Sequence, residues 1–133
     1  KDFQQFQIVK KLVEKNNIPV AVIGCPIHRE DSGLAMSSRN ARLTSEQRNA
    51  APLIYKVLKN VKKKFQEETI EEISEWVENQ FKNHPILQLE YFTIADEKSL
   101  KSINIKEFDK KYRAFIAVFA GNIRLIDNIQ LKN

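Results

Sequence analysis

Two helix-start signals of the same kind constrain the fold of this chain most strongly. Residues 44–47 (Thr-Ser-Glu-Gln) and 69–72 (Thr-Ile-Glu-Glu) each combine a cap threonine with Gln or Glu three positions later, which is the capping box. The first signal predicts a helix that reaches about Phe65, and Pro52 predicts a kink or break inside it. The second predicts another helix, which must end before Pro85.

The chain after these two helices is typical of β-strands. Residues 86–94 are rich in aromatic and β-branched side chains, with Leu87, Leu89 and Tyr91 in alternation, and residues 114–120 are almost all apolar. A Gly-Asn pair at 121–122 then marks a turn into a third apolar segment, which predicts a hairpin. Residues 42–133 are therefore predicted to form an α+β domain, with helices and a small antiparallel sheet.

The first part of the chain shows a different pattern. Residues 2–16 have apolar side chains at helical spacing, and residues 19–24 (Pro-Val-Ala-Val-Ile-Gly) predict a short buried strand. A helix followed by an all-apolar strand is typical of an α/β unit with a parallel sheet. Residues 25–43 lack periodicity and are expected to form a loop, and loops of that length are usually functional or disordered. We therefore interpret residues 1–41 as the end of an α/β domain.

Charge and composition argue against several classes of protein. The 22 Lys and Arg residues exceed the 17 Asp and Glu residues by only five, and the signs are mixed along the chain. The sequence shows no basic face with interleaved aromatic residues, which is the pattern that would indicate nucleic-acid binding. No apolar run approaches the roughly 20 residues of a membrane span, and the first residues do not resemble a signal peptide. Cys25 is the single cysteine, so we expect a reducing, cytoplasmic location. A free cysteine usually behaves as a small hydrophobic residue, and we therefore expect Cys25 to be buried.

Two short segments carry side chains suited to a polyphosphate. Ser37, Ser38 and Arg39 place two hydroxyls and a guanidinium on the predicted loop, where they could bind phosphate oxygens. An ordinary surface turn has the same composition. Lys1 stands at the start of the first helix, where the backbone favours anions, and Gln5 lies one turn further on the same side. Asp2 could serve instead as a helix cap.

Both segments resemble motifs of the pantothenate synthetase family. Residues 1–5 (Lys-Asp-Phe-Gln-Gln) are similar to the start of a late helix in these proteins, and residues 33–40 (Gly-Leu-Ala-Met-Ser-Ser-Arg-Asn) are similar to their most specific motif, with Asp31 displaced by one position. Weaker similarity covers residues 29–30, 91–96 and 124–128, so the resemblance runs end to end. The family's His-x-Gly-His motif has no counterpart, which indicates the C-terminal half of such a protein.

This resemblance implies an enzyme and a set of site residues. Members of the family condense pantoate with beta-alanine, form a pantoyl-adenylate from ATP, and release AMP and pyrophosphate, with Mg²⁺ accompanying ATP. By resemblance, residues 1–41 would end a Rossmann-like ATP-binding domain and residues 42–133 would form a C-terminal lid domain. Gln5 would bind pantoate, and His28 would contact adenine through its backbone. The remaining ATP-site residues would be Lys1, Asp2, Met36, Ser37, Ser38 and Arg39, of which Lys1, Ser37, Ser38 and Arg39 would act in catalysis.

The family also implies partners and leaves alternatives open. We expect an N-terminal domain as partner, a homodimer formed through that domain, no nucleic acid and no membrane, and no activity of this chain alone. One alternative is another nucleotide-handling enzyme of the same superfamily, such as a nucleotidyltransferase. Another is a non-enzymatic basic α+β interaction module. Arg124 and Asp127 are predicted to form a structural polar pair.

Overall fold

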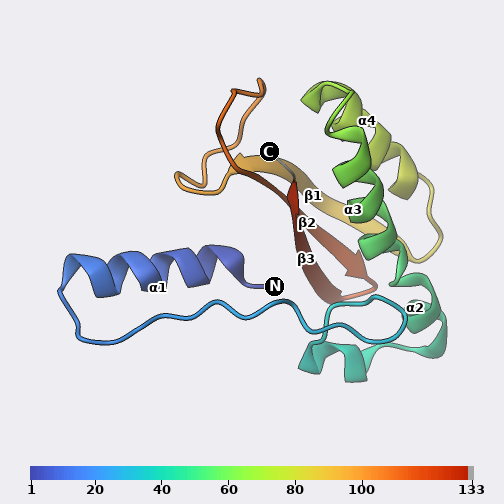
Figure 1. Cartoon of the computed structure of the whole chain (residues 1–133). Helices are drawn as coiled ribbons and strands as arrows, with labels where there is room; N and C mark the ends of the chain where they lie inside the picture. The colour runs from blue at the N-terminus through green and yellow to red at the C-terminus, as the bar shows by residue number, and fades with distance from the viewer. Residues whose placement is uncertain (132–133) are drawn as a thin grey trace.

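Two helices lie against one face of a three-stranded antiparallel sheet in the computed structural model, which describes residues 1–131 (Figure 1). The strands are β1 (Leu87–Asp96), β2 (Tyr112–Ala120) and β3 (Ile123–Leu131), in the spatial order β1-β2-β3. The covering helices are α3 (Leu53–Lys64) and α4 (Ile70–Phe81). The predicted α+β architecture of this part of the chain is confirmed.

The helices begin and break where the local signals require. Thr44 and Thr69 accept hydrogen bonds from the backbone of Gln47 and Glu72, and both capping boxes are complete. The first opens α2 (Ser45–Ala50), and α3 begins directly after Pro52, so the predicted break is confirmed.

The two faces of the sheet have different neighbours. Side chains alternate along a strand, so one set of β2 residues enters the core beneath α3 and α4. The other set includes Phe115, whose ring lies 6.0 Å from that of Phe3. The core face of β2 comprises Tyr112, Ala114, Ile116, Val118 and Ala120.

The predicted hairpin joins β2 to β3, with Ala120 opposite Ile123. Gly121 between them has φ +61°, which glycine adopts without steric strain. The alternation predicted for β1 fails at one place, because the register with β2 shifts between Leu89 and Tyr91. This bulge leaves Tyr91 38% exposed.

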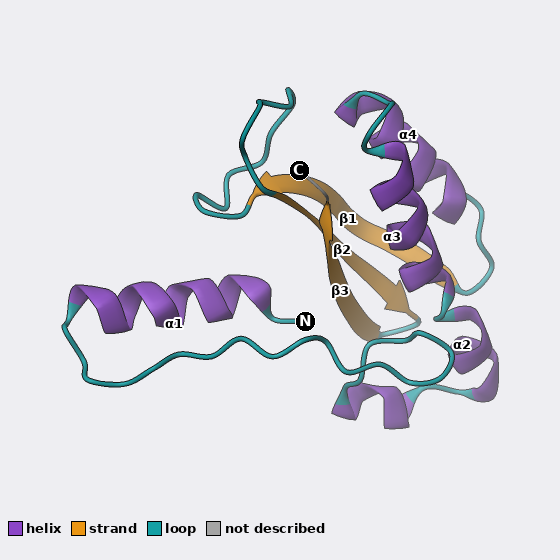
Figure 2. Cartoon of the chain, in the orientation of Figure 1, coloured by secondary structure: helices purple, strands orange, loops and turns teal. Residues whose placement is uncertain are grey.

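The N-terminal segment extends away from the sheet as an arm (Figures 1 and 2). Helix α1 (Phe3–Lys15) is confirmed, but none of its residues is buried. The strand predicted at 19–24 is wrong: this segment has no strand pairing and runs beside α1, with Gly24 against the Phe6 ring. A strand needs a neighbour to accept its hydrogen bonds, and β1, β2 and β3 do not pair with it.

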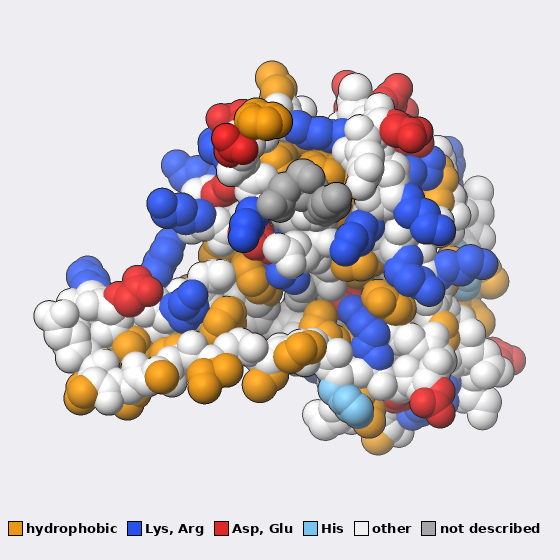
Figure 3. Space-filling model, viewed as in Figure 1, with side chains coloured by type: hydrophobic (Ala, Val, Ile, Leu, Met, Phe, Trp, Pro, Cys, Tyr) orange, Lys and Arg blue, Asp and Glu red, His pale blue; other side chains and the backbone are white. Residues whose placement is uncertain are grey.

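Apolar side chains are consequently exposed along the arm (Figure 3). Ile23 is 81% exposed and Leu12 is 54% exposed. Cys25 is also exposed, so its predicted burial is wrong for the same reason: the described chain provides no layer that covers this segment. Among residues 1–131, no helix has both the length and the apolar character that crossing a membrane requires.

Candidate nucleotide site

The loop that carries the predicted phosphate-binding residues is folded back on itself by backbone hydrogen bonds. Met36 donates to the His28 carbonyl at 2.9 Å, and Glu30 donates to the Leu34 carbonyl at 2.9 Å. Gly33 closes the turn with φ +94°, and a Cβ at this position would lie 2.8 Å from the Tyr55 ring. Both the backbone conformation and the close approach therefore require glycine at position 33.

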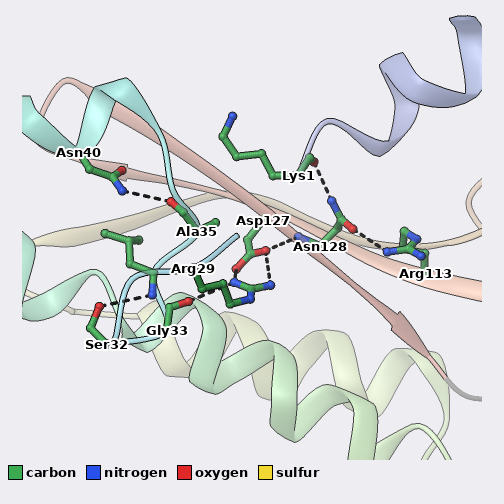
Figure 4. A network of polar contacts seen from close by, with 10 residues as sticks. Lys1, Arg29, Ser32, Gly33, Ala35, Asn40, Arg113, Asp127 and Asn128 are labelled. Atoms are coloured by element: carbon green, nitrogen blue, oxygen red, sulfur yellow. Dashed lines mark hydrogen bonds and ion pairs between the residues drawn. The ribbon is translucent and has the colours of Figure 1, made fainter. Parts of the chain in front are cut away.

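Arg29 fixes this loop to the sheet and to α3. Its guanidinium donates to both carboxylate oxygens of Asp127, at 2.6 and 2.9 Å, and to the Gly33 carbonyl at 3.1 Å (Figure 4). It also lies over the Tyr55 ring, 3.6 Å from the centroid. A two-pronged bond to a carboxylate combined with stacking on an aromatic ring is geometry that arginine provides and lysine cannot.

The predicted pair of Arg124 with Asp127 is wrong. Arg124 instead bonds to Glu90 at 2.6 Å, while Asp127 bonds to Arg29. Residues three positions apart in a strand point to opposite faces, so the side chains of 124 and 127 separate across the sheet.

A second set of bonds holds the end of the loop. Ser37 accepts a hydrogen bond from the backbone of Arg39 and begins the short helix η1 (Ser38–Arg42). Asn40 is 3% exposed and donates to the Glu30 carboxylate and the Ala35 carbonyl. Its Oδ1 atom has no hydrogen-bond partner among the described residues.

The Lys1 segment contacts strand β3 on the face of the sheet opposite to Asp127. Asn128 donates to the Lys1 carbonyl at 2.6 Å and accepts from Arg113 at 2.7 Å (Figure 4). The Arg113 guanidinium also lies 4.0 Å from the centre of the Phe3 ring. Asp2 makes no side-chain cap bond to α1, and its carboxylate pairs with the Lys1 ammonium at 3.2 Å.

These contacts bring part of the predicted site together. A small pocket of about 10 Å³ is lined by Lys1, Ser37 and Arg39, with Asn40 and Asp127 in its wall. A wider hollow of about 500 Å³ extends from Lys1 and Asp2 along residues 23–27 of the arm. The predicted residues that do not line the small pocket are Asp2, Gln5, His28, Met36 and Ser38.

Most charges around the small pocket are already paired. Lys1 pairs with Asp2, and Arg124 pairs with Glu90, which raises the pKa of Arg124. Among the described residues no ion pair matches Arg39, so its guanidinium is the charge available to an anion. The negative charge of Asp127 is matched by Arg29. No group of three or more His, Cys, Asp or Glu side chains within residues 1–131 could hold a metal ion.

Sequence reasoning missed the contacts that hold the site together. The segments that carry the family resemblance include Arg29, Asp127 and Asn128. Their structural role is evident only from their tertiary contacts. Asn40 closes the Ser-Ser-Arg-Asn motif, and its burial explains why an amide stands there. The available signal was a pair of adjacent polar residues, Asp127 and Asn128, flanked by isoleucines in β3.

Comparison with known proteins gives a consistent result. A family profile described as pantoate-beta-alanine ligase matches residues 1–130. The chain is 58% identical over 133 residues to the pantothenate synthetase of Christiangramia forsetii and 52% identical over 132 residues to that of Flavobacterium psychrophilum. These alignments include at least 99% of this chain and 47% of each relative, so the chain spans about half the length of the curated relatives that it matches.

Solved structures show the same relationship. A pantothenate synthetase from Thermus thermophilus matches with a TM-score of 0.88 and 30% identity, covering 100% of this chain and 48% of that one. A pantoate-beta-alanine ligase from Francisella tularensis, described as complexed with beta-gamma ATP and beta-alanine, matches with a TM-score of 0.62 and 29% identity, covering 100% of this chain and 42% of that one. The chain therefore belongs to the pantoate-beta-alanine ligase family.

Proposed function

We propose that this chain supplies the C-terminal part of an ATP-dependent ligase that condenses pantoate with beta-alanine through a pantoyl-adenylate. The observation that carries the proposal is the meeting of Lys1, Ser37 and Arg39 at one pocket, in a chain of this family. The Francisella relative is described with an ATP analogue and beta-alanine, which supports the same substrates here.

The chemistry explains why cations are needed at this pocket. A pantoate carboxylate oxygen would attack the α-phosphorus of ATP, and the bond to pyrophosphate would break. Negative charge approaches negative charge in this step, so fixed donors lower its barrier. Lys1 and Arg39 are the cations we assign to the phosphates, with the Ser37 and Ser38 hydroxyls as further donors. The amine of beta-alanine would then attack the acyl carbon, and AMP would leave.

The remaining predicted residues receive roles around this centre. We assign Asp2 to the nucleoside and the backbone of His28 to the adenine. Met36 is assigned to the wall of the nucleotide site, and Gln5 to pantoate. Mg²⁺ is proposed to arrive bound to the ATP phosphates, as part of the substrate. These roles rest on the family resemblance, and the exposed positions of Asp2, Gln5, His28 and Met36 are compatible with ligand contact.

We propose further that the activity needs a second domain, which corresponds to the part of the curated relatives that this chain does not match. The exposed apolar side chains along the arm suit contact with such a domain, since exposed apolar surface commonly marks interaction sites. They include Ile8, Leu12, Val20 and Ile23. A homodimer formed through that domain and a cytoplasmic location are part of the same proposal. Alone, this chain should form no pantothenate.

Co-expression with the unmatched half of the Christiangramia forsetii relative tests the proposal. The purified complex should form pantothenate and AMP from pantoate, beta-alanine and ATP, and the chain alone should not. In this complex Arg39→Ala should lower kcat/KM for ATP by about 10²- to 10³-fold, because one electrostatic donor is lost. Arg42→Ala is the matched control: Arg42 lies on the same short helix, outside the pocket lining, and should change the rate by less than about twofold.

Each alternative would give a different result. A folded complex that transfers the nucleotidyl group into its product and releases no AMP would indicate a nucleotidyltransferase. Salt-sensitive binding of nucleic acid without nucleotide binding would indicate an interaction module. An active complex in which Arg39→Ala retains the parent rate would contradict the role of Arg39 while leaving the ligase activity in place.

A further inference from the structure

Two adjacent polar residues are buried in the edge strand β3. Asp127 is 4% exposed and Asn128 is 2% exposed. Burying such groups is unfavourable unless they are hydrogen-bonded, so their partners explain their presence. In this chain those partners are the two segments that carry the candidate nucleotide site.

The two side chains leave the sheet on opposite faces. Asp127 stands opposite Ile116 on the face covered by α3, and Asn128 stands opposite Phe115 on the face that meets Phe3. Because the two residues are adjacent in the strand, their side chains make contacts on opposite faces of the sheet.

Asp127 holds the loop. Its carboxylate accepts both prongs of Arg29, and the same guanidinium donates to the Gly33 carbonyl three residues before Met36. A two-pronged ion pair fixes orientation as well as distance. The loop that carries Ser37 and Arg39 is thereby tied to a defined point on β3.

Asn128 holds the Lys1 segment, and chemistry fixes which way its amide points. Arg113 can only donate, so the atom that faces Arg113 at 2.7 Å must be the amide oxygen. The amide NH₂ group then faces the Lys1 carbonyl, to which it donates at 2.6 Å. The backbone of Asn128 also donates to Asp127 at 2.8 Å, which links the two contacts directly (Figure 4).

We propose that Asp127 and Asn128 are positioning residues: acting through Arg29 and through the Lys1 backbone, they set the place of Lys1 relative to Ser37 and Arg39. The inference rests on the proposed function, because it assumes that these segments bind ATP together. Its physical basis is that a displacement of about 1 Å in a positioned group can cost on the order of 10²-fold in rate.

Asn128→Asp separates positioning from folding. The substitution keeps the size of the side chain and the oxygen that accepts from Arg113, but it places a carboxylate oxygen against the Lys1 carbonyl. In the co-expressed complex, kcat/KM for ATP should fall about 10- to 100-fold, while KM for beta-alanine stays within about twofold and Tm changes by no more than about 3 °C. Asn60→Asp is the matched control, since Asn60 also donates to a backbone carbonyl, on exposed α3 surface, and should leave all values near those of the parent.

Several outcomes would overturn the inference. ATP constants within twofold of the parent would do so, as would equal losses for ATP and beta-alanine, which a general structural role predicts. If Asn128→Asp lowers Tm by more than about 3 °C, Arg113→Lys takes its place, because it removes the fork that orients the Asn128 amide but keeps the charge beside Glu97. The same ATP-specific loss is then required. A parent complex that makes no pantothenate would instead refute the proposed function itself, so the two failures are distinguishable.

Discussion

Arg29 connects three parts of the chain through one guanidinium. It bonds to Asp127 on β3, to the Gly33 carbonyl in its own loop, and lies against the Tyr55 ring on α3. The Arg29 side chain is 17% exposed and that of Asp127 only 3%, so the pair is largely removed from water. Under these conditions the loss of one partner leaves a buried charge without compensation.

Arg29→Ala should therefore be strongly destabilising at the residue scale. We expect the free energy of unfolding of the 133-residue chain to fall by about 3 kcal/mol, measured by urea denaturation, because Asp127 remains buried and unpaired. Adding Asp127→Asn should recover part of this loss, since it removes the uncompensated charge. Equal stability of the single and double variants would show that the charge of Asp127 is not the cause.

The capping boxes show what short sequence signals contribute at the element scale. In α4 the Thr69 hydroxyl accepts from the Glu72 backbone at 3.2 Å, and the Glu72 carboxylate accepts from the Thr69 backbone at 2.8 Å. These bonds satisfy backbone groups that the first turn of a helix leaves without partners. The hydrogen bonds that the Thr69 backbone and hydroxyl donate to the Glu72 carboxylate also hold the pKa of that carboxyl below its usual value.

Thr69→Ala should destabilise the chain by about 1 kcal/mol, which is typical of a lost helix cap. Thr69→Ser is the control, because serine retains the hydroxyl and caps at least as well. The free energy of unfolding from chemical denaturation of both variants measures the difference. A loss shared equally by Ser and Ala would assign the effect to the threonine methyl group instead.

At the scale of the whole molecule, the chain consists of a well-packed part and an exposed arm. The core lies between the sheet and the helices α3 and α4, whereas α1 has no buried residue and touches the sheet through Phe3. An isolated helix of this length is marginal in water, because the first turn is costly to form. The stability of the arm should therefore be far below that of the core.

Amide hydrogen exchange provides the measurement for the arm. In the chain alone, amides of α1 should exchange with protection factors of about 10 or less, while those of β2 approach the protection of global unfolding. Binding of the unmatched half of the Christiangramia forsetii relative should slow exchange in α1 and leave β2 little changed. Protection of α1 equal to that of β2 in the isolated chain would contradict this division.

The sequence by itself determined the helices, the hairpin and the family resemblance. Capping boxes, the break at Pro52 and the turn at residues 121–122 act through bonds between near neighbours, so a local pattern suffices to predict them. The strand predicted at 19–24 was wrong because strand formation requires a neighbour, which local composition does not supply. Burial of Cys25 was wrong because burial requires a covering layer.

Only the tertiary structure decided how the candidate site is held. Arg29 and Asp127 are 98 positions apart, and Asn128 lies 127 positions from Lys1, so no local period relates them. Their pairing follows from the alternation of side chains across β3, which sends Asp127 to one face and Asn128 to the other. Residue types indicated which side chains suit a polyphosphate, but the folding of the sheet brought Lys1, Ser37 and Arg39 to the same pocket.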